Sequence, residues 1–346
     1  MKNNKLKKVL VAIVIVLVVG ALGFKFYYNR LVNHPFKLTI DSVELEVKDG
    51  QSLNEVLKKL SNQKIIGNTY LIKYYVKSNN MDTNIKKGRY LIEKDMTLDT
   101  FLNNLSSGKV TAGLTKVTIP EGYNIEEIAA SLEKSQIISK EEFLNAVKEY
   151  DAPSYIKKDS ERKYQLEGFL FPDTYEFEKD ISGEEIIERM ISRFEEVISE
   201  IEQATGVKID KNNLDSIVTM ASIVEKEAVR DDERAKVASV FYNRIEKHTK
   251  FQSCATVLYA LGYHKEEVSN EDIKVNSPYN TYKVDGLPVG PIACPGKASL
   301  NAAINPEKTN YLFFISNDDG THSFTDSDEE FMRLKEIRDN KIKNKK

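Results

Sequence analysis

Apolar and polar residues between positions 43 and 108 follow a pattern that predicts a strand, two helices, a second strand and a third helix. Alternation of apolar and polar residues marks each strand, and apolar residues three or four positions apart mark each helix. Ser52-Leu-Asn-Glu55 has the form of a capping box, which predicts where the first helix begins. The predicted strands are residues 43–47 and 88–92, and the predicted helices are residues 52–60, 68–77 and 97–105.

The same pattern returns further along the chain. When the chain is aligned with itself without gaps, Gly50 falls on Gly122 and Glu55 on Glu127. The match later resumes at a larger offset, so the second copy carries an insertion. An internal repeat of this size indicates two related modules. Pairs at the larger offset are Tyr90 with Tyr175, Glu93 with Glu178, Lys94 with Lys179, Asp95 with Asp180 and Thr97 with Ser182.

The insertion precedes an aromatic-rich stretch, residues 167–175, which has no counterpart in the first copy until its end. This stretch contains Glu167, Pro172 and Asp173. Two interpretations stay open, because its composition fits the wall of a cleft as well as a packed connection between elements.

The second half of the chain begins with helical periodicity and ends in turns. Helices are predicted at residues 183–204, 213–230 and 231–248, and short strands at 311–316 and 321–325. Prolines cluster between these two regions and predict defined loops. The tail, residues 333–346, is charged and is predicted to be a frayed, solvated end. Together these elements predict an α+β fold.

The helix at residues 213–230 carries a carboxylate of special interest. Glu225 lies in the middle of its apolar stripe, so partial removal from water should raise its pKa and suit it to acid chemistry. Glu227 points to the opposite side and is expected to be an ordinary solvated charge. The alternative is that Glu225 lies at the solvated edge of the apolar stripe or pairs with a buried arginine. The stripe consists of Leu214, Ile217, Val218, Ala221, Val224 and Ala228.

The N-terminus predicts a membrane anchor. Four lysines precede an uninterrupted apolar run, residues 9–24, which as a helix would span roughly 24 Å. Aromatic residues follow the run and help it to reach across a bilayer of about 30 Å. The lysines favour a cytoplasmic N-terminus and an extracytoplasmic remainder. A cleaved signal peptide is the competing interpretation, because Ala21-Leu22-Gly23 resembles a cleavage site.

Composition narrows the function classes. Fifty Lys and Arg against 53 Asp and Glu give a net charge of −3, which argues against a nucleic-acid binder. The two cysteines, Cys254 and Cys294, are too few for a disulfide scaffold, and their spacing matches no zinc motif. We therefore expect no metal and no cofactor.

Ordered motifs in the second half carry a resemblance to a known family. With these motifs the chain resembles the MltG (YceG-like) family of membrane-anchored endolytic murein transglycosylases, from about residue 40 to about residue 330. The motifs are Leu166-Glu-Gly-Phe-Leu-Phe-Pro-Asp-Thr-Tyr175, Ala221-Ser-Ile-Val-Glu-Lys-Glu227, Lys236-Val-Ala-Ser-Val-Phe-Tyr-Asn-Arg244, Gln252-Ser253, Thr256-Val257, Tyr279-Asn-Thr-Tyr282, Gly286-Leu-Pro288, Gly290-Pro-Ile292 and Pro295-Gly296.

The resemblance implies a LysM-like module near the N-terminus and an α+β catalytic region, and it places the catalytic glutamate at Glu225. It also implies peptidoglycan glycan strands as the substrate and peptidoglycan synthases as partners. The expected order is a cytoplasmic tail (1–8), an anchor (9–28), a linker (29–42), a LysM-like module (43–110), a second related module (117–195), a catalytic domain (205–332) and a basic tail (333–346).

Further site residues follow from the motifs. Gln252, Asn280 and Tyr282 are candidates to bind sugar or to stabilise an oxocarbenium ion, although Asn and Gln in tight loops often bond only to backbone. His322 is a candidate for substrate contact or for a structural cap, and Glu167 for a second acidic group. Cys254 and Cys294 stand where the family commonly has Asp and Asn, and we hypothesise a disulfide between them, with two free thiols as the alternative.

Three functions remain open at this point. A lytic transglycosylase needs one acid/base, Glu225, because the C6 hydroxyl of the sugar attacks in place of water and yields a 1,6-anhydromuramic acid end. A hydrolytic muramidase would need a second carboxylate, such as Glu167 or Asp173. A non-catalytic scaffold would only bind peptidoglycan through its two small modules.

Overall fold

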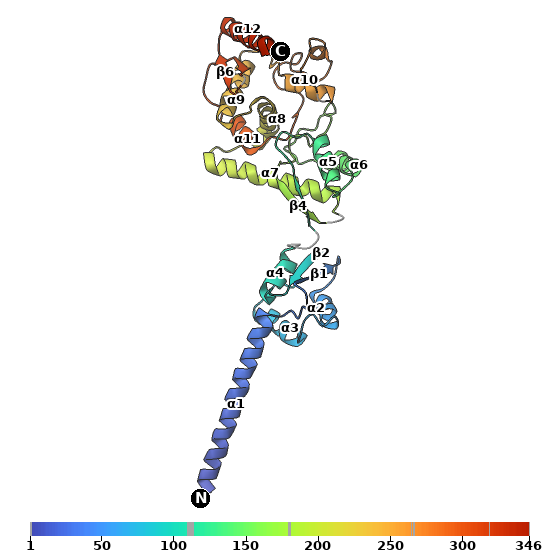
Figure 1. Cartoon of the computed structure of the whole chain (residues 1–346), viewed down its shortest axis with the longest axis vertical. Helices are drawn as coiled ribbons and strands as arrows, with labels where there is room; N and C mark the ends of the chain where they lie inside the picture. Colours follow the sequence, from blue (N-terminus) through green and yellow to red (C-terminus); the bar gives the residue numbers. More distant parts are fainter. Residues whose placement is uncertain are drawn as a thin grey trace. The chain divides into compact units, whose positions relative to one another are not determined.

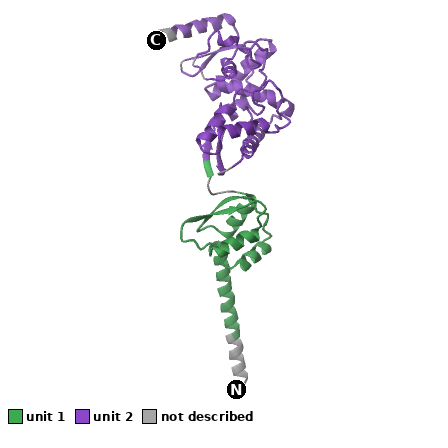
Figure 2. Cartoon of the chain, turned by 90° about the vertical axis from the view of Figure 1, so that its right-hand side faces the viewer, with its two compact units in different colours: residues 1–115 green, residues 116–346 purple. Residues whose placement is uncertain are grey.

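The computed structural model describes residues 2–108, 114–178, 181–263, 265, 267–317 and 319–345. Of the predicted repeat pairs, Lys94 with Lys179 and Asp95 with Asp180 lie partly outside the described residues. The chain divides into two compact units, Met1–Thr115 and Lys116–Lys346 (Figure 2).

The first unit packs three short helices against a two-stranded antiparallel sheet. In this sheet Ser42 lies opposite Glu93, and Val47 opposite Gly88. The apolar faces of the helices close over the strands, and Val56, Ile72 and Ile92 are fully buried. The elements are α1 (Lys2–Asn33), β1 (Ser42–Val47), α2 (Leu53–Asn62), α3 (Thr69–Ser78), β2 (Gly88–Glu93) and α4 (Leu98–Ser107).

The N-terminal helix α1 carries the apolar run into the first unit. Its segment Ile13–Asn33 is long and apolar enough to cross a membrane, which is the condition for the predicted anchor. Near its end Leu31 is buried, and the ring of Tyr28 lies 6.3 Å from that of Tyr75 in α3. The helix therefore extends into the stretch predicted to be a linker, residues 29–42.

The second unit is mixed α/β, and its central helix is α8, which contacts α9, α10 and α11 (Figure 1). Its strands form two small sheets, β3 with β4 and β5 with β6. The elements are β3 (Leu114–Thr118), α5 (Ile125–Lys134), α6 (Lys140–Glu149), β4 (Thr174–Glu178), α7 (Gly183–Thr205), α8 (Lys211–Glu227), α9 (Asp231–Glu246), α10 (Cys254–Leu261), the 3₁₀ turn η1 (Asp272–Lys274), α11 (Lys297–Ile304), β5 (Phe313–Ser316), β6 (His322–Thr325) and α12 (Asp328–Lys345).

The order strand, helix, helix, strand, helix occurs twice, as β1-α2-α3-β2-α4 and as β3-α5-α6-β4-α7. Even local backbone details recur at matching positions of the two copies. Capping boxes begin α2, at Ser52, and α5, at Asn124. After each of these helices one non-glycine residue has a positive φ, Lys64 at 61° and Gln136 at 56°. The two copies therefore share a chain path as well as a sequence pattern.

The sequence pattern missed three helices. Two of them, α10 and α11, are only eight residues long and lie in the turn-rich region. The third, α12, occupies the tail that was predicted to be frayed and solvated. The tail is helical through Lys345, so the prediction of a frayed end is wrong, but its described side chains are mostly exposed to solvent as predicted. Its residues are mostly polar, but Phe331 stacks on Phe313 of β5 with ring centroids 4.9 Å apart and fixes the helix to the sheet.

The aromatic stretch after the insertion is a packed connection. Leu166, Phe169 and Leu170 are fully buried against α7 and α8. Gly168 has φ +87°, and a Cβ there would lie 2.5 Å from Cβ of Pro291 and 2.9 Å from Cγ1 of Val218. Only glycine fits both this backbone conformation and this close approach.

We expect Gly168→Ala to destabilise the second unit far more than Gly206→Ala. Both glycines have a positive φ, but a Cβ at Gly206 meets nothing within 4 Å. Chemical denaturation should show a loss of about 1 kcal/mol for Gly206→Ala. Gly168→Ala should lose a further ~2 kcal/mol or more because Pro291 and Val218 must move. Equal losses would contradict this account of the packing.

Candidate active site

The helix α8 delivers two glutamates to different surroundings. Its residues 218–224 are all buried in the core of the second unit, and the helix ends at Glu227. Ala228 then takes an extended backbone conformation, with φ −94° and ψ 119°. Glu225 thus lies in the last turn of the helix. Glu227 is the last residue of the helix, and neighbouring loops surround its side chain.

Glu227 is half-buried, so the prediction of an ordinary solvated charge is wrong. The Ser253 hydroxyl donates a hydrogen bond of 2.5 Å to its Oε1. Burial raises the pKa of Glu227, and the hydrogen bonds from Ser253 and from the Ala255 amide only partly oppose this shift. The net direction of the shift in pKa is towards the protonated form of this carboxyl group.

Two cavities meet at this carboxyl group. One, of about 510 Å³, is lined by residues of α5 and α10, and its Glu126 pairs with Lys163 at 2.8 Å. The other, of about 860 Å³, is lined by residues of α9, β5 and α12. Glu227 and Cys254 line both cavities. A long ligand could thus lie on both sides of Glu227.

Glu225 has the buried arginine partner that the sequence left open as an alternative. Its side chain is 7% exposed, and its Oε1 lies 3.3 Å from Nη1 of Arg234 in α9. Its Oε2 accepts a hydrogen bond of 2.9 Å from the backbone N–H of Gly296. Both oxygens are occupied within the protein, and Glu225 lines neither of the two cavities. These contacts tie α8 to α9 and to the loop before α11.

Of the predicted sugar-binding residues, Gln252 and Tyr282 line the larger cavity. Gln252 is exposed and has φ 53°, a conformation that is uncommon for a residue other than glycine and that often marks functional sites. The Tyr282 hydroxyl lies 3.3 Å from Sγ of Cys254. Burial raises the pKa of Tyr282, so its hydroxyl keeps its proton.

Asn280 and Glu167 are structural. Asn280 is fully buried, and its amide donates to the carbonyls of Ile273 and Val275 at 2.9 and 2.8 Å. Glu167 is 1% exposed and lines neither cavity. It accepts hydrogen bonds from the Ile125 amide at 3.1 Å and from the Tyr259 hydroxyl at 2.8 Å. Neither side chain is placed to contact a ligand directly.

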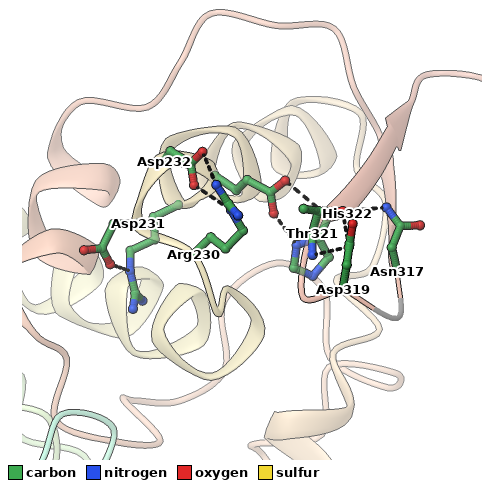
Figure 3. A network of polar contacts seen from close by, with 9 residues as sticks. Arg230, Asp231, Asp232, Asn317, Asp319, Thr321 and His322 are labelled. Carbon is green, nitrogen blue, oxygen red and sulfur yellow. Dashed lines mark hydrogen bonds and ion pairs between the residues drawn. The ribbon is translucent and has the colours of Figure 1, made fainter.

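His322 lines the larger cavity and is fixed from behind by Glu233 of α9. The two oxygens of Glu233 contact the backbone N–H of His322 at 3.1 Å and its Nδ1 at 2.8 Å. Figure 3 shows His322 beside the turn of Asn317, Asp319 and Thr321, with Arg230 and Asp232 paired on the neighbouring helix. The side chain is 3% exposed, so this histidine positions β6 and presents little surface to a ligand.

The hypothesised disulfide is absent. Cys254 and Cys294 are both free thiols, the first exposed and the second fully buried. Cys294 is fixed in the core because its backbone exchanges hydrogen bonds with Tyr123 at 2.7 Å and Gly122 at 2.9 Å. Cys254 instead begins α10 at the cavity wall. Among the described residues no group of three or more His, Cys, Asp or Glu is arranged to hold a metal ion.

Sequence reasoning missed three residues at this site. The helical azimuth of Glu227 predicts a solvated charge, Ser253 and Arg244 stand out only as members of motifs, and Arg244 lines the larger cavity. The single sequence signal was their membership of the ordered motifs. Their proximity depends on loops that bring the start of α10 against the end of α8.

Comparison with known proteins identifies the class. The model of the YceG-like family matches residues 45–336, and the chain therefore belongs to this family. A Bacillus subtilis (strain 168) relative, named endolytic murein transglycosylase, is 35% identical over 329 residues, which cover 91% of this chain and 90% of that protein. A Streptococcus pneumoniae (strain D39) protein of the same name is 28% identical over 342 residues, covering 90% of this chain and 62% of that protein.

A solved structure is also similar. The crystal structure of a YceG-like protein from Listeria monocytogenes is 35% identical, with a TM-score of 0.56. The match covers 85% of this chain and 99% of that one.

We expect Glu167 to make the stability of the protein depend on pH. Burial raises its pKa from 4.5 to about 8, so the folded state binds a proton that the unfolded state releases. The stabilisation is fully present below pH 4.5 and is lost as the pH rises through about 8. The free energy of unfolding should therefore fall with pH in this window, by at most ~1.4 kcal/mol per pH unit from this group.

The variant Glu167→Gln keeps an amide oxygen for the Ile125 N–H and an amide N–H for the Tyr259 hydroxyl. Chemical denaturation between pH 4.5 and 8 should show a shallower pH dependence in this variant. The exposed Glu161→Gln change is the control and should leave the dependence unaltered. The same slope in Glu167→Gln as in the unmodified protein would contradict the assignment.

Proposed function

We propose that the chain is a membrane-anchored endolytic murein transglycosylase and that Glu227 is its general acid/base. The observation that carries the proposal is the position of Glu227, a carboxyl group whose pKa burial raises and which lines two adjoining cavities. A protonated carboxyl at a cleft is what general acid catalysis near neutral pH needs. The names of the relatives support the substrate, murein.

The proposed reaction uses one carboxyl group twice. Glu227 first donates its proton to the glycosidic oxygen between N-acetylmuramic acid and N-acetylglucosamine, and the bond from that oxygen to the anomeric carbon breaks. The C6 hydroxyl of the muramic acid residue attacks the same carbon, and its proton passes to the Glu227 carboxylate. A 1,6-anhydromuramic acid end forms without added water, and Glu227 recovers its starting state.

Ser253 would position the acid during this cycle. Ser253 is 3% exposed, and its hydroxyl donates to Oε1 of Glu227, while its backbone N–H donates to the Thr281 hydroxyl at 3.0 Å. Thr281 also shares a hydrogen bond of 2.8 Å with the buried Thr256 hydroxyl. A rigid set of hydroxyl groups of this kind restricts the rotation of the carboxyl group towards the cavities.

The two carboxylates named for the hydrolytic alternative lie away from both cavities. Hydrolysis requires a nucleophile or base roughly 5 to 9.5 Å from the acid. The two candidates were Glu167, which is 1% exposed, and Asp173, which pairs with Nε of Arg193 at 2.8 Å. Neither lines either cavity. Glu126 and Glu127 do line the smaller cavity together with Glu227, and Glu126 pairs with Lys163 at 2.8 Å, so the product of the digestion decides between the two reactions.

The anchor and the modules belong to the same proposal. We infer that α1 spans the plasma membrane once, with the lysine-rich N-terminus in the cytoplasm and the catalytic region outside. The first unit would act as a LysM-like glycan-binding module, residues 43–110. Residues 117–195 would be a related module that shares the second compact unit with the catalytic domain, residues 205–332. Peptidoglycan synthases are the proposed protein partners.

We expect Glu227→Gln to lower the rate of glycan cleavage about 10²- to 10⁴-fold, since the amide cannot donate the required proton. Glu225→Gln should lower stability by removing the charge that faces Arg234, but reduce the rate less than about tenfold once the protein is folded. Mass spectrometry of peptidoglycan digested with the full chain in detergent micelles measures both the rate and the product.

Each outcome of this digestion has a clear meaning. Anhydro ends from the unmodified protein and from Glu225→Gln, but not from Glu227→Gln, support the proposal. Loss of cleavage in folded Glu225→Gln with activity retained in Glu227→Gln would move the acid/base role to Glu225. Reducing ends would indicate the muramidase, and intact strands with the unmodified protein would favour the non-catalytic scaffold.

A further inference from the structure

The C-terminal helix α12 forms part of the wall of the larger cavity. Phe331, near its start, stacks on Phe313, and the helix contacts both β5 and β6. One and two turns further along, Lys335 and Arg338 line the cavity of about 860 Å³ together with Phe331. The helix thus presents two cationic side chains to the space that Glu227 and Gln252 also line.

A third cation reaches this cavity from α9. Arg244 is 8% exposed, and its guanidinium donates to the carbonyl of Leu312 through Nε and to those of Lys250 and Phe251 through Nη1. Among the described residues its Nη2 has no hydrogen bond and the side chain has no ion pair, although the nearby carboxyl group of Glu227 interacts with it electrostatically. No described buried side-chain nitrogen or oxygen is left without a partner, so Nη2 is not fully buried, and Arg244 lines the cavity.

Arg244 keeps its positive charge in this position. Burial lowers the pKa of its guanidinium, but an arginine remains protonated at neutral pH. Three carbonyl groups fix its orientation without neutralising it. A buried guanidinium that has carbonyl partners but no carboxylate at ion-pair distance is a suitable binding group for an anion.

The remaining charged groups at this cavity leave an excess of positive charge. Glu227 is the one acidic residue in its described lining, and its raised pKa favours the neutral form. His322 pairs with Glu233, which lies behind it. Arg338 contacts Asp339 at 3.0 Å, whereas Lys335 is exposed and has no ion pair within the described part of the chain.

We propose that this side of the cleft is an anion subsite, in which Arg244, Lys335 and Arg338 bind a carboxylate of the peptides that murein strands carry. The inference rests on the proposed function, since it takes the substrate to be a murein strand. The sugars of such a strand are recognised through hydroxyl and amide groups, while its peptides supply the free carboxylates. A strand that passes Glu227 would thus place a peptide against α12.

The experiment compares strands with and without peptides. Full-length Glu227→Gln protein in detergent micelles binds fluorescent glycan strands, and anisotropy gives the Kd. The strands are either peptide-bearing or stripped of peptides by an amidase and then amidated at the lactyl carboxylates that the amidase frees. Adding Lys335→Gln and Arg338→Gln should weaken binding of peptide-bearing strands about tenfold or more and leave binding of stripped strands within twofold. The effect should shrink at high salt concentration.

Controls keep the result specific. Lys341→Gln with Lys308→Gln removes two exposed lysines that line neither cavity and should change nothing. Arg244 is left intact, because its three carbonyl contacts make a folding defect the expected result of its loss. Lys335→Arg with Arg338→Lys should keep most of the affinity, since the charges are retained.

Two outcomes would overturn the subsite. One is an equal loss of affinity for both strand types, and the other is no loss for either. Stripped strands that end in a phosphate form a third arm of the experiment. If Lys335→Gln with Arg338→Gln lost affinity only for these strands, the cations would be assigned to a phosphate and the peptide assignment would be overturned. A failure of the unmodified protein to cleave strands counts against the proposed function alone, because binding is measured on the Glu227→Gln background.

Discussion

The carboxyl group of Glu227 is half-buried at the end of a core helix and still lines two cavities, and the proposed function depends on this position. The core helix α8 ends at Glu227, so the side chain of this residue lies between loops. The start of α10 supplies the Ser253 hydroxyl, and β6, α9 and α12 complete the larger cavity. Desolvation then raises the pKa of the carboxyl group. Protonation, positioning and access thus depend on one packing arrangement.

The duplicated module is the part of the fold that its sequence predicted best, because its signals are local. The serine and asparagine caps of α2 and α5 satisfy backbone N–H groups within the first turn of each helix. The positive φ of Lys64 and of Gln136 ends the same helix of each copy in the same way. Such features depend on residues that are neighbours in the chain and not on what packs against the module. Aligning the chain with itself was therefore enough to find them.

The site was harder to predict, because its residues are defined by contacts between distant segments. The helical wheel placed Glu225 correctly in the buried stripe, with 7% of its side chain exposed, but it had no means to locate Arg234 on the next helix. The helical azimuth also failed to predict the environment of Glu227, because this residue is the last of the helix and its neighbours lie in loops. Asn280 bonds only to backbone, as its alternative interpretation allowed. The mostly polar α12 owes its place to the contact of Phe331 with Phe313.

The most direct test of the central claim is a titration of the Glu227 carboxyl group itself. Full-length protein labelled with ¹³C at the glutamate side-chain carboxyls, in detergent micelles, gives one NMR signal per group, and Glu227→Gln identifies the signal of interest by its disappearance. The account predicts a pKa above the ordinary glutamate value of 4.5 for this signal. A pKa at or below that value would contradict the account, because a carboxylate already ionised cannot serve as the acid.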